Sequence, residues 1–350
     1  MRSKARWYAA WCMGLLFMTG LVACKSGGMK AAQGNGEETS GKRAVYYWKT
    51  ILRMSDEDLK FIKSHGIGKM YVRFFDVIEG TDFDGKRKAL PEATLQFEET
   101  IPKDIEIVPV VFITVESLKE GGKDLAVPLY TRVKAMCEAN GIENLREIQL
   151  DCDWTVSTRD IFYKVCAEVR EMAHRDGIDL SATIRLHQLK SEAPPVDRGV
   201  LMLYNTGNIY DEKEENSILS YENAEPYLRQ SIKFDLPLSL ALPTYQWGLL
   251  YRDGEFMCIL HNVDFDDEDT FESMGNNRMR VIESSYTGDM WMLGGDEVRI
   301  EWPDMETIRR VKKLAMKQIK DPIEETIIYH LDATNLAKYT FDEMEEILGE

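Results

Sequence analysis

Apolar runs of strand length alternate along the chain with segments whose apolar residues recur at helical spacing. Eight of the runs are rich in Val, Ile, Leu, Tyr and Phe, and several are apolar almost throughout, as in strands covered on both faces. Strands and helices in alternation predict a parallel sheet, and eight such units suit the length of one (β/α)8 barrel. The expected strands are residues 44–51, 69–77, 106–114, 147–154, 180–188, 199–205, 236–245 and 326–331.

Helix start signals precede several of the segments between the strands. Ser55 stands before three acidic residues, which predicts an N-cap box, and Thr158 precedes an apolar stripe at helical spacing. Pro194, which a second proline follows, favours a short connection after the fifth strand. The last two helices are expected over 304–320 and 341–348.

About sixty residues separate the seventh strand from the helix expected at 304, and a loop of that length is seldom without structure. We therefore expect a small α+β insertion over about 248–301, on one side of the barrel mouth. The acidic run 264–269 within it favours a solvated loop over a calcium site. The predicted fold class is α/β: a (β/α)8 TIM barrel over residues 44–350 with this insertion after strand 7.

The first 43 residues are not expected to belong to the fold. A basic start and a short apolar core end at Val22-Ala23-Cys24, which resembles the lipobox of bacterial lipoproteins. The resemblance implies a signal peptide over 1–23 and a lipidated Cys24, hence a protein of the bacterial cell envelope, anchored by lipid to the outer membrane. The alternatives are an ordinary secretory signal or a membrane helix, for which the apolar run is short. Residues 24–43 are rich in Gly, Ser and Lys and predict a flexible tether.

The chain is strongly acidic, with a formal net charge of −17. Because residues 1–43 are basic, the excess of carboxylates over 44–350 is larger still, which argues against nucleic acid as a partner. An acidic domain also repels anionic headgroups, so lipid rather than a basic patch should hold it at a membrane. No CxxC pair is present, and spacing leaves open whether a disulfide forms among the cysteines beyond the tether: Cys137, Cys152, Cys166 and Cys258.

Residues 147–154 (EIQLDCDW) form an apolar strand that ends in two carboxylates and an indole. Alternate residues of a strand share a face, so Asp151 and Asp153 should point the same way. Barrel enzymes place their chemistry at such strand ends. The pair is therefore the candidate catalytic centre if the protein is an enzyme. The alternative is a pair of structural carboxylates bonded to loop amides.

Polar and aromatic side chains follow most of the expected strands and would share one face of the barrel. Flat rings beside acids and amides suit a neutral polyhydroxylated ligand such as a glycan, whereas the glycine-rich loop of a phosphate-binding barrel is missing. No cofactor is expected. The candidate substrate-binding residues are Trp48, Arg73, Asp76, Glu116, Trp154, Arg185, His187, Tyr204, Asn205, Tyr245, Trp247 and Asp332.

Three of the strand ends resemble motifs of family 18 glycoside hydrolases, the family of chitinases and endo-N-acetylglucosaminidases. Residues 151–155 (DCDWT) resemble the strand-4 motif Asp-x-Asp-x-Glu, 202–205 (MLYN) the strand-6 motif Met-x-Tyr-Asp, and 242–245 (LPTY) the strand-7 motif Leu-Pro-x-Tyr. The matches keep the family's order, and in the family an α+β insertion likewise follows strand 7. The resemblance implies a chitinase-like barrel with a glycan at its mouth.

The departure from the family lies at Thr155, where the family has the glutamate that protonates the glycosidic oxygen. A threonine hydroxyl has no accessible acidic pKa and cannot act as that acid near neutral pH. The resemblance also implies that Tyr204 would hydrogen-bond the acetamido oxygen, while Asn205 replaces an aspartate. A second resemblance, to lipoproteins of Bacteroides-type bacteria, carries no known activity and rests on the segments 46–49 (YYWK), 71–76 (YVRFFD) and 149–155 (QLDCDWT).

Three functions are open at this point. The missing glutamate favours a membrane-anchored, glycan-binding lipoprotein that keeps the cleft without the standard acid. The second is an active glycoside hydrolase with a rearranged pair, in which Asp153 works with a carboxylate from another strand: Glu116, Asp76 or Asp332. The third is a metal-dependent hydrolase with ligands drawn from Asp151, Asp153, His187 and His330.

Overall fold

The computed structural model describes residues 43–81, 84–261, 263–287 and 290–349. The expected signal peptide, tether and lipidated Cys24 lie outside these ranges. Within them, none of the helices combines the length and the apolar character that crossing a membrane would need.

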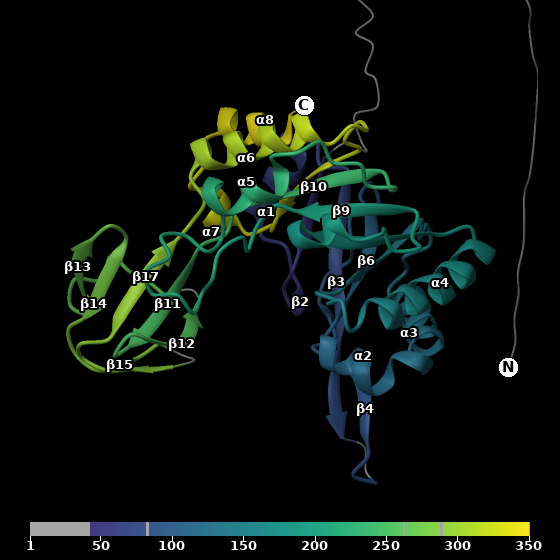
Figure 1. The fold of residues 1–350 in the computed structure, drawn as a ribbon, viewed down its shortest axis with the longest axis horizontal. Helices are drawn as coiled ribbons and strands as arrows, with labels where there is room; N and C mark the ends of the chain where they lie inside the picture. Colours follow the sequence, from purple (N-terminus) through teal and green to yellow (C-terminus); the bar gives the residue numbers. More distant parts are fainter. Residues whose placement is uncertain (1–42, 82–83, 262, 288–289, 350) are drawn as a thin grey trace, which may run out of the picture. The chain divides into compact units, whose positions relative to one another are not determined.

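Eight parallel strands close into a barrel, which confirms the predicted TIM fold (Figure 1). Each expected run overlaps one of them, and the first strand closes the barrel by pairing with both the second and the last. These strands are buried almost throughout, because one face fills the interior and the other packs under helices. In order around the barrel they are β1 (Arg43–Tyr47), β3 (Lys69–Thr81), β6 (Glu106–Ile113), β7 (Glu147–Asp151), β8 (Asp179–Arg185), β9 (Arg198–Met202), β10 (Leu238–Pro243) and β18 (Thr326–Tyr329).

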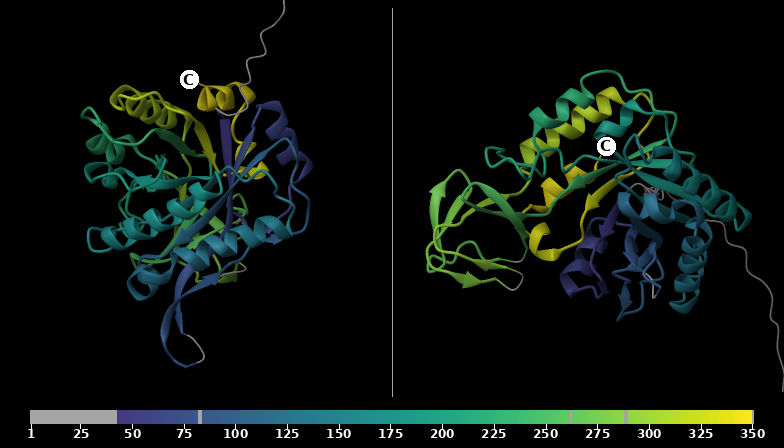
Figure 2. Two further views of the ribbon diagram at one scale, coloured as in Figure 1. Left: turned by 90° about the vertical axis from the view of Figure 1, so that its right-hand side faces the viewer. Right: turned by 60° about the horizontal axis from the view of Figure 1, so that its bottom comes forward.

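Helices connect the strands and cover the outside of the barrel, as two further views show (Figure 2). Ser55 caps the first helix through the predicted capping box with Asp58. Thr158 stands at the start of α4, but its Oγ1 accepts a hydrogen bond from the Thr155 amide (3.0 Å) instead of from the helix. The helices are α1 (Asp56–Ser64), α2 (Val115–Gly121), α3 (Ala126–Ala139), α4 (Arg159–Arg175), α5 (Tyr221–Leu228), α6 (Met305–Gln318), α7 (Ala333–Leu336) and α8 (Phe341–Leu348).

Several short elements complete the barrel. As the two prolines predict, a single 3₁₀ turn, η2 (Leu186–Lys190), stands after the fifth barrel strand in place of a full helix. β3 runs beyond the barrel wall and pairs antiparallel with β4 (Arg87–Glu92), a hairpin that the apolar pattern did not indicate. The remaining short elements are η1 (Gly122–Asp124), β2 (Ile51–Leu52) and β5 (Gln96–Phe97), of which the two strands pair with each other.

The segment after the seventh barrel strand forms a five-stranded and a separate two-stranded antiparallel sheet, which share a small core (Figure 1). The insertion lies at the predicted place, but its expected helical part is wrong: the described residues of the insertion form strands and turns. Hairpin turns at Asp253 and Asn276, both with positive φ, connect neighbouring antiparallel strands, so no helix forms there. The acidic run 264–269 forms exposed Asx turns around buried Phe265. The strands are β11 (Trp247–Arg252), β12 (Glu255–Leu260), β13 (Phe271–Gly275), β14 (Arg278–Val281), β15 (Ser285–Tyr286), β16 (Trp291–Met292) and β17 (Glu297–Glu301).

The barrel interior carries polar side chains from end to end. On β7, Glu147, Gln149 and Asp151 alternate inward, and each finds partners on other strands. At the amino-terminal end, Lys69 donates to Glu147 (2.7 Å) and to Glu325 (2.9 Å). One layer higher, Gln149 bonds a tyrosine and a serine hydroxyl. Asp151 forms the last layer, at the carboxyl-terminal mouth.

Replacing Lys69 by methionine should destabilise the fold by about 3–5 kcal/mol, since it leaves Glu147 and Glu325 buried without their cation. Urea unfolding followed by circular dichroism measures the loss. Lys60→Met, on the exposed face of α1, is the matched control and should change the stability by under about 0.5 kcal/mol. Equal stability of the two variants would contradict a structural role for the buried ion pairs.

Candidate functional site

Arg185 joins the two aspartates at the carboxyl end of β7. Its Nη2 donates to Asp151 Oδ1 (3.2 Å), and its Nε donates to Asp153. Arg185 ends the neighbouring strand β8, so parallel pairing brings the guanidinium to the same edge. Thr183, two residues earlier, donates to the same Asp151 oxygen (2.5 Å). The two carboxylates therefore lie on one side, as strand alternation predicts, with one cation between them.

Burial sets the electrostatics of this triad of Asp151, Asp153 and Arg185. Asp151 is almost fully buried, whereas Asp153 is exposed. Burial raises the pKa of the Asp151 carboxyl; Arg185 opposes the rise and the charge of Asp153 adds to it. Although burial disfavours a cation, the two carboxylates keep the pKa of Arg185 above its usual value. With both carboxylates ionised, the triad holds one net negative charge in a fixed position.

Tyrosine and tryptophan rings form a contiguous cluster at the same end of the barrel. Tyr329 stacks on Tyr204 with ring centroids 4.7 Å apart, and Tyr245 meets the edge of Trp247 at 5.3 Å. Tyr329 also contacts Trp48 at 5.8 Å. Tyr329 was not among the expected site residues, because it lies within the last barrel strand and not after it. The inward alternation of that strand is the signal that could have found it.

Four other expected residues of the mouth are held by neighbours. Arg73 donates from Nε to Asp76 (2.7 Å) and lies 5.6 Å from the centroid of the Trp48 ring. Asp332 pairs with Lys49 (3.1 Å). Asn205, with φ of +52°, accepts a hydrogen bond from the Tyr245 hydroxyl (2.6 Å). The mouth is therefore a set of fixed charges and dipoles rather than a group of free side chains.

Trp154 requires a correction. It is 2% exposed and packs edge-on against Tyr163 of α4, with centroids 5.4 Å apart, so the prediction of a substrate-facing indole is wrong. The chain turns toward α4 directly after β7, and burying the large ring under the helix is more favourable than leaving it in water.

His187 is exposed on η2, and burial lowers the pKa of its imidazole, while the charges of Asp153 and Arg185 also act on it. Glu116 is exposed in the first turn of α2.

Thr155 stands where the sequence resemblance would place the catalytic acid of family 18. Its hydroxyl forms a hydrogen bond with that of Ser157 (2.9 Å) in the turn before α4. Two of the carboxylates considered as a replacement, Asp76 and Asp332, are ion-paired as described above. Each of these two carboxylates is thus held by a cation of its own.

Glu301 is a further carboxylate of the mouth, and the sequence pattern does not indicate it. It ends β17 of the insertion, is 1% exposed, and accepts a hydrogen bond from Trp247 Nε1 (2.7 Å). Ser217 donates to the same oxygen (2.5 Å) and Arg299 to the other (2.7 Å). Glu301 therefore positions the Trp247 ring. No local signal reveals this role, since the residues that Glu301 joins lie far apart in sequence.

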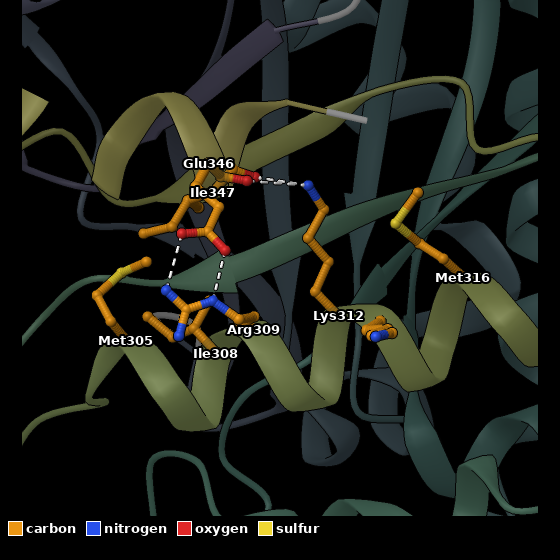
Figure 3. A pocket seen from close by; sticks show the side chains of 8 residues that line it. Met305, Ile308, Arg309, Lys312, Met316, Glu346 and Ile347 are labelled. Carbon is orange, nitrogen blue, oxygen red and sulfur yellow. Dashed lines mark hydrogen bonds and ion pairs between the residues drawn. The ribbon is translucent and has the colours of Figure 1, made fainter. Parts of the chain in front are cut away.

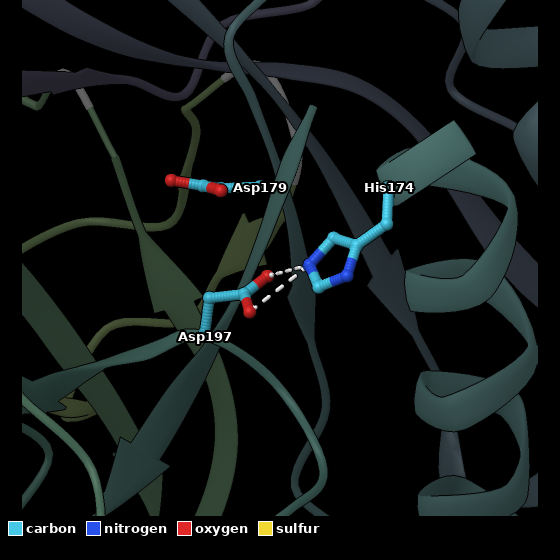
Figure 4. A group of neighbouring side chains, drawn as sticks. All are labelled: His174, Asp179 and Asp197. Carbon is cyan, nitrogen blue, oxygen red and sulfur yellow. Dashed lines mark hydrogen bonds and ion pairs between the residues drawn. The ribbon is translucent and has the colours of Figure 1, made fainter. Parts of the chain in front are cut away.

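Among the described residues, one group of side chains has the spacing of metal ligands: His174, Asp179 and Asp197 (Figure 4). It lies where β8 and β9 begin, at the end of the barrel opposite the mouth. Its carboxylates are already paired, because Arg170 donates to Asp197 (2.6 Å) and Arg198 to Asp179 (2.8 Å). The ligand set considered for a metal-dependent hydrolase is not gathered into such a group, so the described geometry does not support that function.

Two cavities lie away from the mouth. One of about 340 Å³ lies between α6 and α8, where Lys312 donates to the Ile347 carbonyl (2.9 Å) and Arg309 pairs with Glu346 (Figure 3). Its polar groups hold α8 against α6. The other, of about 700 Å³, lies in the inserted sheet. The mouth is therefore the candidate site because of its chemistry and not because of these hollows.

No protein-family model and no curated protein sequence matches the chain. Among solved structures, the chain is similar to the C-terminal domain of a protein designated a chitinase from Desulfitobacterium hafniense DCB-2, with a TM-score of 0.52, 9% identity, and coverage of 88% of this chain and 100% of that one. It is also similar to the spore cortex-lytic enzyme SleL of Bacillus megaterium QM B1551, with a TM-score of 0.50, 11% identity, and coverage of 88% and 74%. At these identities the likeness concerns the fold: the chain forms a chitinase-like (β/α)8 barrel.

Replacing Arg185 by methionine should cost about 3–5 kcal/mol of stability at about pH 7, because buried Asp151 loses its cation. Without Arg185 the pKa of Asp151 rises further. A carboxyl whose pKa is raised by folding stabilises the fold at low pH and loses that contribution as the pH rises through the folded-state pKa. The cost should therefore be smaller at about pH 4 than at about pH 7.

Adding Asp151→Asn to Arg185→Met should restore most of the loss at the higher pH, since the buried group is then neutral. Urea unfolding at both pH values measures the four states of this cycle. Arg175→Met, on the exposed face of α4, is the control. A cost that does not depend on pH and is not rescued would show that Arg185 acts through packing alone.

Proposed function

We propose that the protein is a membrane-anchored lipoprotein that binds a glycan at the mouth of its chitinase-like barrel, without the standard acid of family 18 hydrolases. The triad carries the proposal: Arg185 holds both aspartates of the strand-4 motif, while Thr155 stands where the acid would be. A fixed polar group beside a ring cluster can hold a ligand without supplying a proton to it.

The chemistry of the mouth supports a neutral ligand rich in hydroxyl groups. The partly exposed rings of Trp48 and Trp247 can pack on the C–H faces of sugars, and the exposed Asp153 can accept hydrogen bonds from their hydroxyls. The Tyr204 hydroxyl is buried with no partner among the described residues, which suits the contact with an acetamido oxygen that the family resemblance implies. Because one structural neighbour is designated a chitinase, chitin oligosaccharides are the first probes.

One observation favours the alternative of an active hydrolase with a rearranged pair. Burial raises the pKa of the Asp151 carboxyl, which is the direction of change that a general acid needs. However, Asp151 Oδ1 already accepts hydrogen bonds from both Thr183 and Arg185, and both of these contacts oppose protonation of the carboxyl. Binding without hydrolysis is therefore the function that the geometry supports best.

Asp153→Asn should weaken glycan binding by about 1–3 kcal/mol, the scale of a lost hydrogen bond to a charged group, and the parent should show no turnover. A glycan array that includes chitin oligosaccharides identifies the ligand, titration calorimetry measures its affinity, and mass spectrometry of the mixture detects products. Asp235→Asn, exposed at the opposite end of the barrel, is the control and should bind as the parent does.

Two other results would change this assignment. Turnover by the parent that Asp153→Asn abolishes, with binding largely kept, would establish the hydrolase. Unchanged binding and turnover in both Asp151→Asn and Asp153→Asn would leave the two carboxylates as structural groups.

The anchor is a separate part of the proposal and rests on the resemblance of residues 22–24 to a lipobox. Cys24→Ala should leave the protein unprocessed or release it from membranes, because the thiol is the expected site of lipid attachment. Membrane fractionation and uptake of labelled fatty acid measure the effect. Cys12→Ala, within the expected signal peptide, should be processed and lipidated normally. Normal labelling of the Cys24→Ala variant would refute the anchor.

A further inference from the structure

The insertion presents an aromatic pair to solvent on its two-stranded sheet, β15 and β16. Tyr286 and Trp291 face each other across β15 and β16, with 63% and 54% of their surface exposed. Their rings are 6.5 Å apart at an interplanar angle of 29°, so two flat faces lie close to parallel. Single exposed apolar residues are ordinary, but large rings grouped on a surface mark binding sites.

The pair is held from inside the sheet. Met292 follows Trp291 and is fully buried in the core of the insertion, which directs the Trp291 ring to the opposite face. Arg252 of β11 donates to the Trp291 carbonyl (3.2 Å) and pairs with Asp296 (2.7 Å). The backbone that carries the rings is thus bonded to β11 of the five-stranded sheet. The rings are exposed because the neighbouring Met292 occupies the core.

The cavity of about 700 Å³ adjoins this hairpin along the chain on both sides, through Ile282 before β15 and Gly295 after β16. Its polar lining can accept and donate hydrogen bonds to hydroxyl groups. Acidic groups outnumber the single cation in this lining, which disfavours phosphates, nucleic acid and anionic headgroups as ligands. The polar residues concerned are Asp266, Glu268, Glu272, Ser273 and Arg280.

We infer that this surface, made of Tyr286, Trp291 and the adjoining cavity, is a second glycan-binding site that takes a neutral polysaccharide chain. The rings pack on the apolar faces of the sugars, and the cavity groups bind their hydroxyls. The choice of a glycan rests on the proposed function, whereas the ring pair and the cavity are independent of it. β11 runs from Trp247 at the mouth to Arg252 beneath the hairpin, about 17 Å at ~3.4 Å per residue. A long polymer therefore contacts both sites, while a short oligosaccharide occupies one.

The double variant Tyr286→Ala/Trp291→Ala separates the two sites. Its retention on insoluble chitin and on peptidoglycan sacculi should fall about tenfold or more, the scale of losing aromatic contacts. Its affinity for a short chitin oligosaccharide at the mouth should stay unchanged. Phe341→Ala removes an exposed ring from α8 and is the matched control, which should bind the polymers as the parent does. Thermal unfolding of each variant shows that the fold is kept.

Polymer binding by the double variant equal to that of the parent overturns the inference, as does a parent that binds neither polymer. If the double variant instead loses binding to phosphatidylcholine vesicles, the rings contact lipid and the inference is likewise overturned. The proposed function fails by a different result. If Asp153→Asn leaves the affinity for the short oligosaccharide unchanged while the double variant loses the polymers, the ring pair binds glycan and the mouth does not.

Discussion

A polar side chain that points into a closed barrel must find its hydrogen-bond or ion-pair partner on another strand. Strand β7 places such a side chain in each layer of the barrel interior. Glu147, Gln149 and Asp151 all point inward, and all three are buried. Lys69 forms an ion pair with Glu147, and Arg185 forms one with Asp151. Because hydrogen bonding between strands fixes which residues meet, the position of the guanidinium at the mouth follows from the register that places the lysine at the base. The candidate site is thus the carboxyl-terminal layer of a stack of polar side chains to which several barrel strands contribute.

The same packing limits what the mouth can do. A carboxylate that is fixed by a guanidinium is a good acceptor of hydroxyl hydrogen bonds but a poor donor of protons, and for this reason we propose binding and not hydrolysis at the triad. The inserted sheet is part of this arrangement. Through Glu301 it orients Trp247, whose ring belongs to the mouth. A glycan-binding surface that spans barrel and insertion would depend on this single buried carboxylate for its alignment.

The barrel could be predicted because its strands are long apolar runs that indicate one kind of element. The common orientation of Asp151 and Asp153 could be predicted because residues two apart in a strand share a face. The insertion could not be predicted as all strand, because its strands are only two to six residues long and leave no periodic pattern that excludes a helix. Trp154 illustrates a second limit. An indole next to two acidic residues gives the same sequence pattern whether it faces a ligand or the core, and only the path of the chain into α4 determines which of the two it faces. Glu301 illustrates a third, because its partners come from three separate segments.

The pairing of β1 with β18 has a consequence for how the chain reaches this state. Arg43 lies opposite Thr326 in the barrel wall and also pairs with Glu345 of α8 (3.0 Å). Contacts between such distant residues form late, because the entropy of closing the long loop opposes them until most of the sheet exists. Until β18 arrives, β1 and β10 are open strand edges. A chain that stops short of this strand would therefore expose two templates for pairing with other chains, and aggregation would compete with folding until the last strand closes the ring.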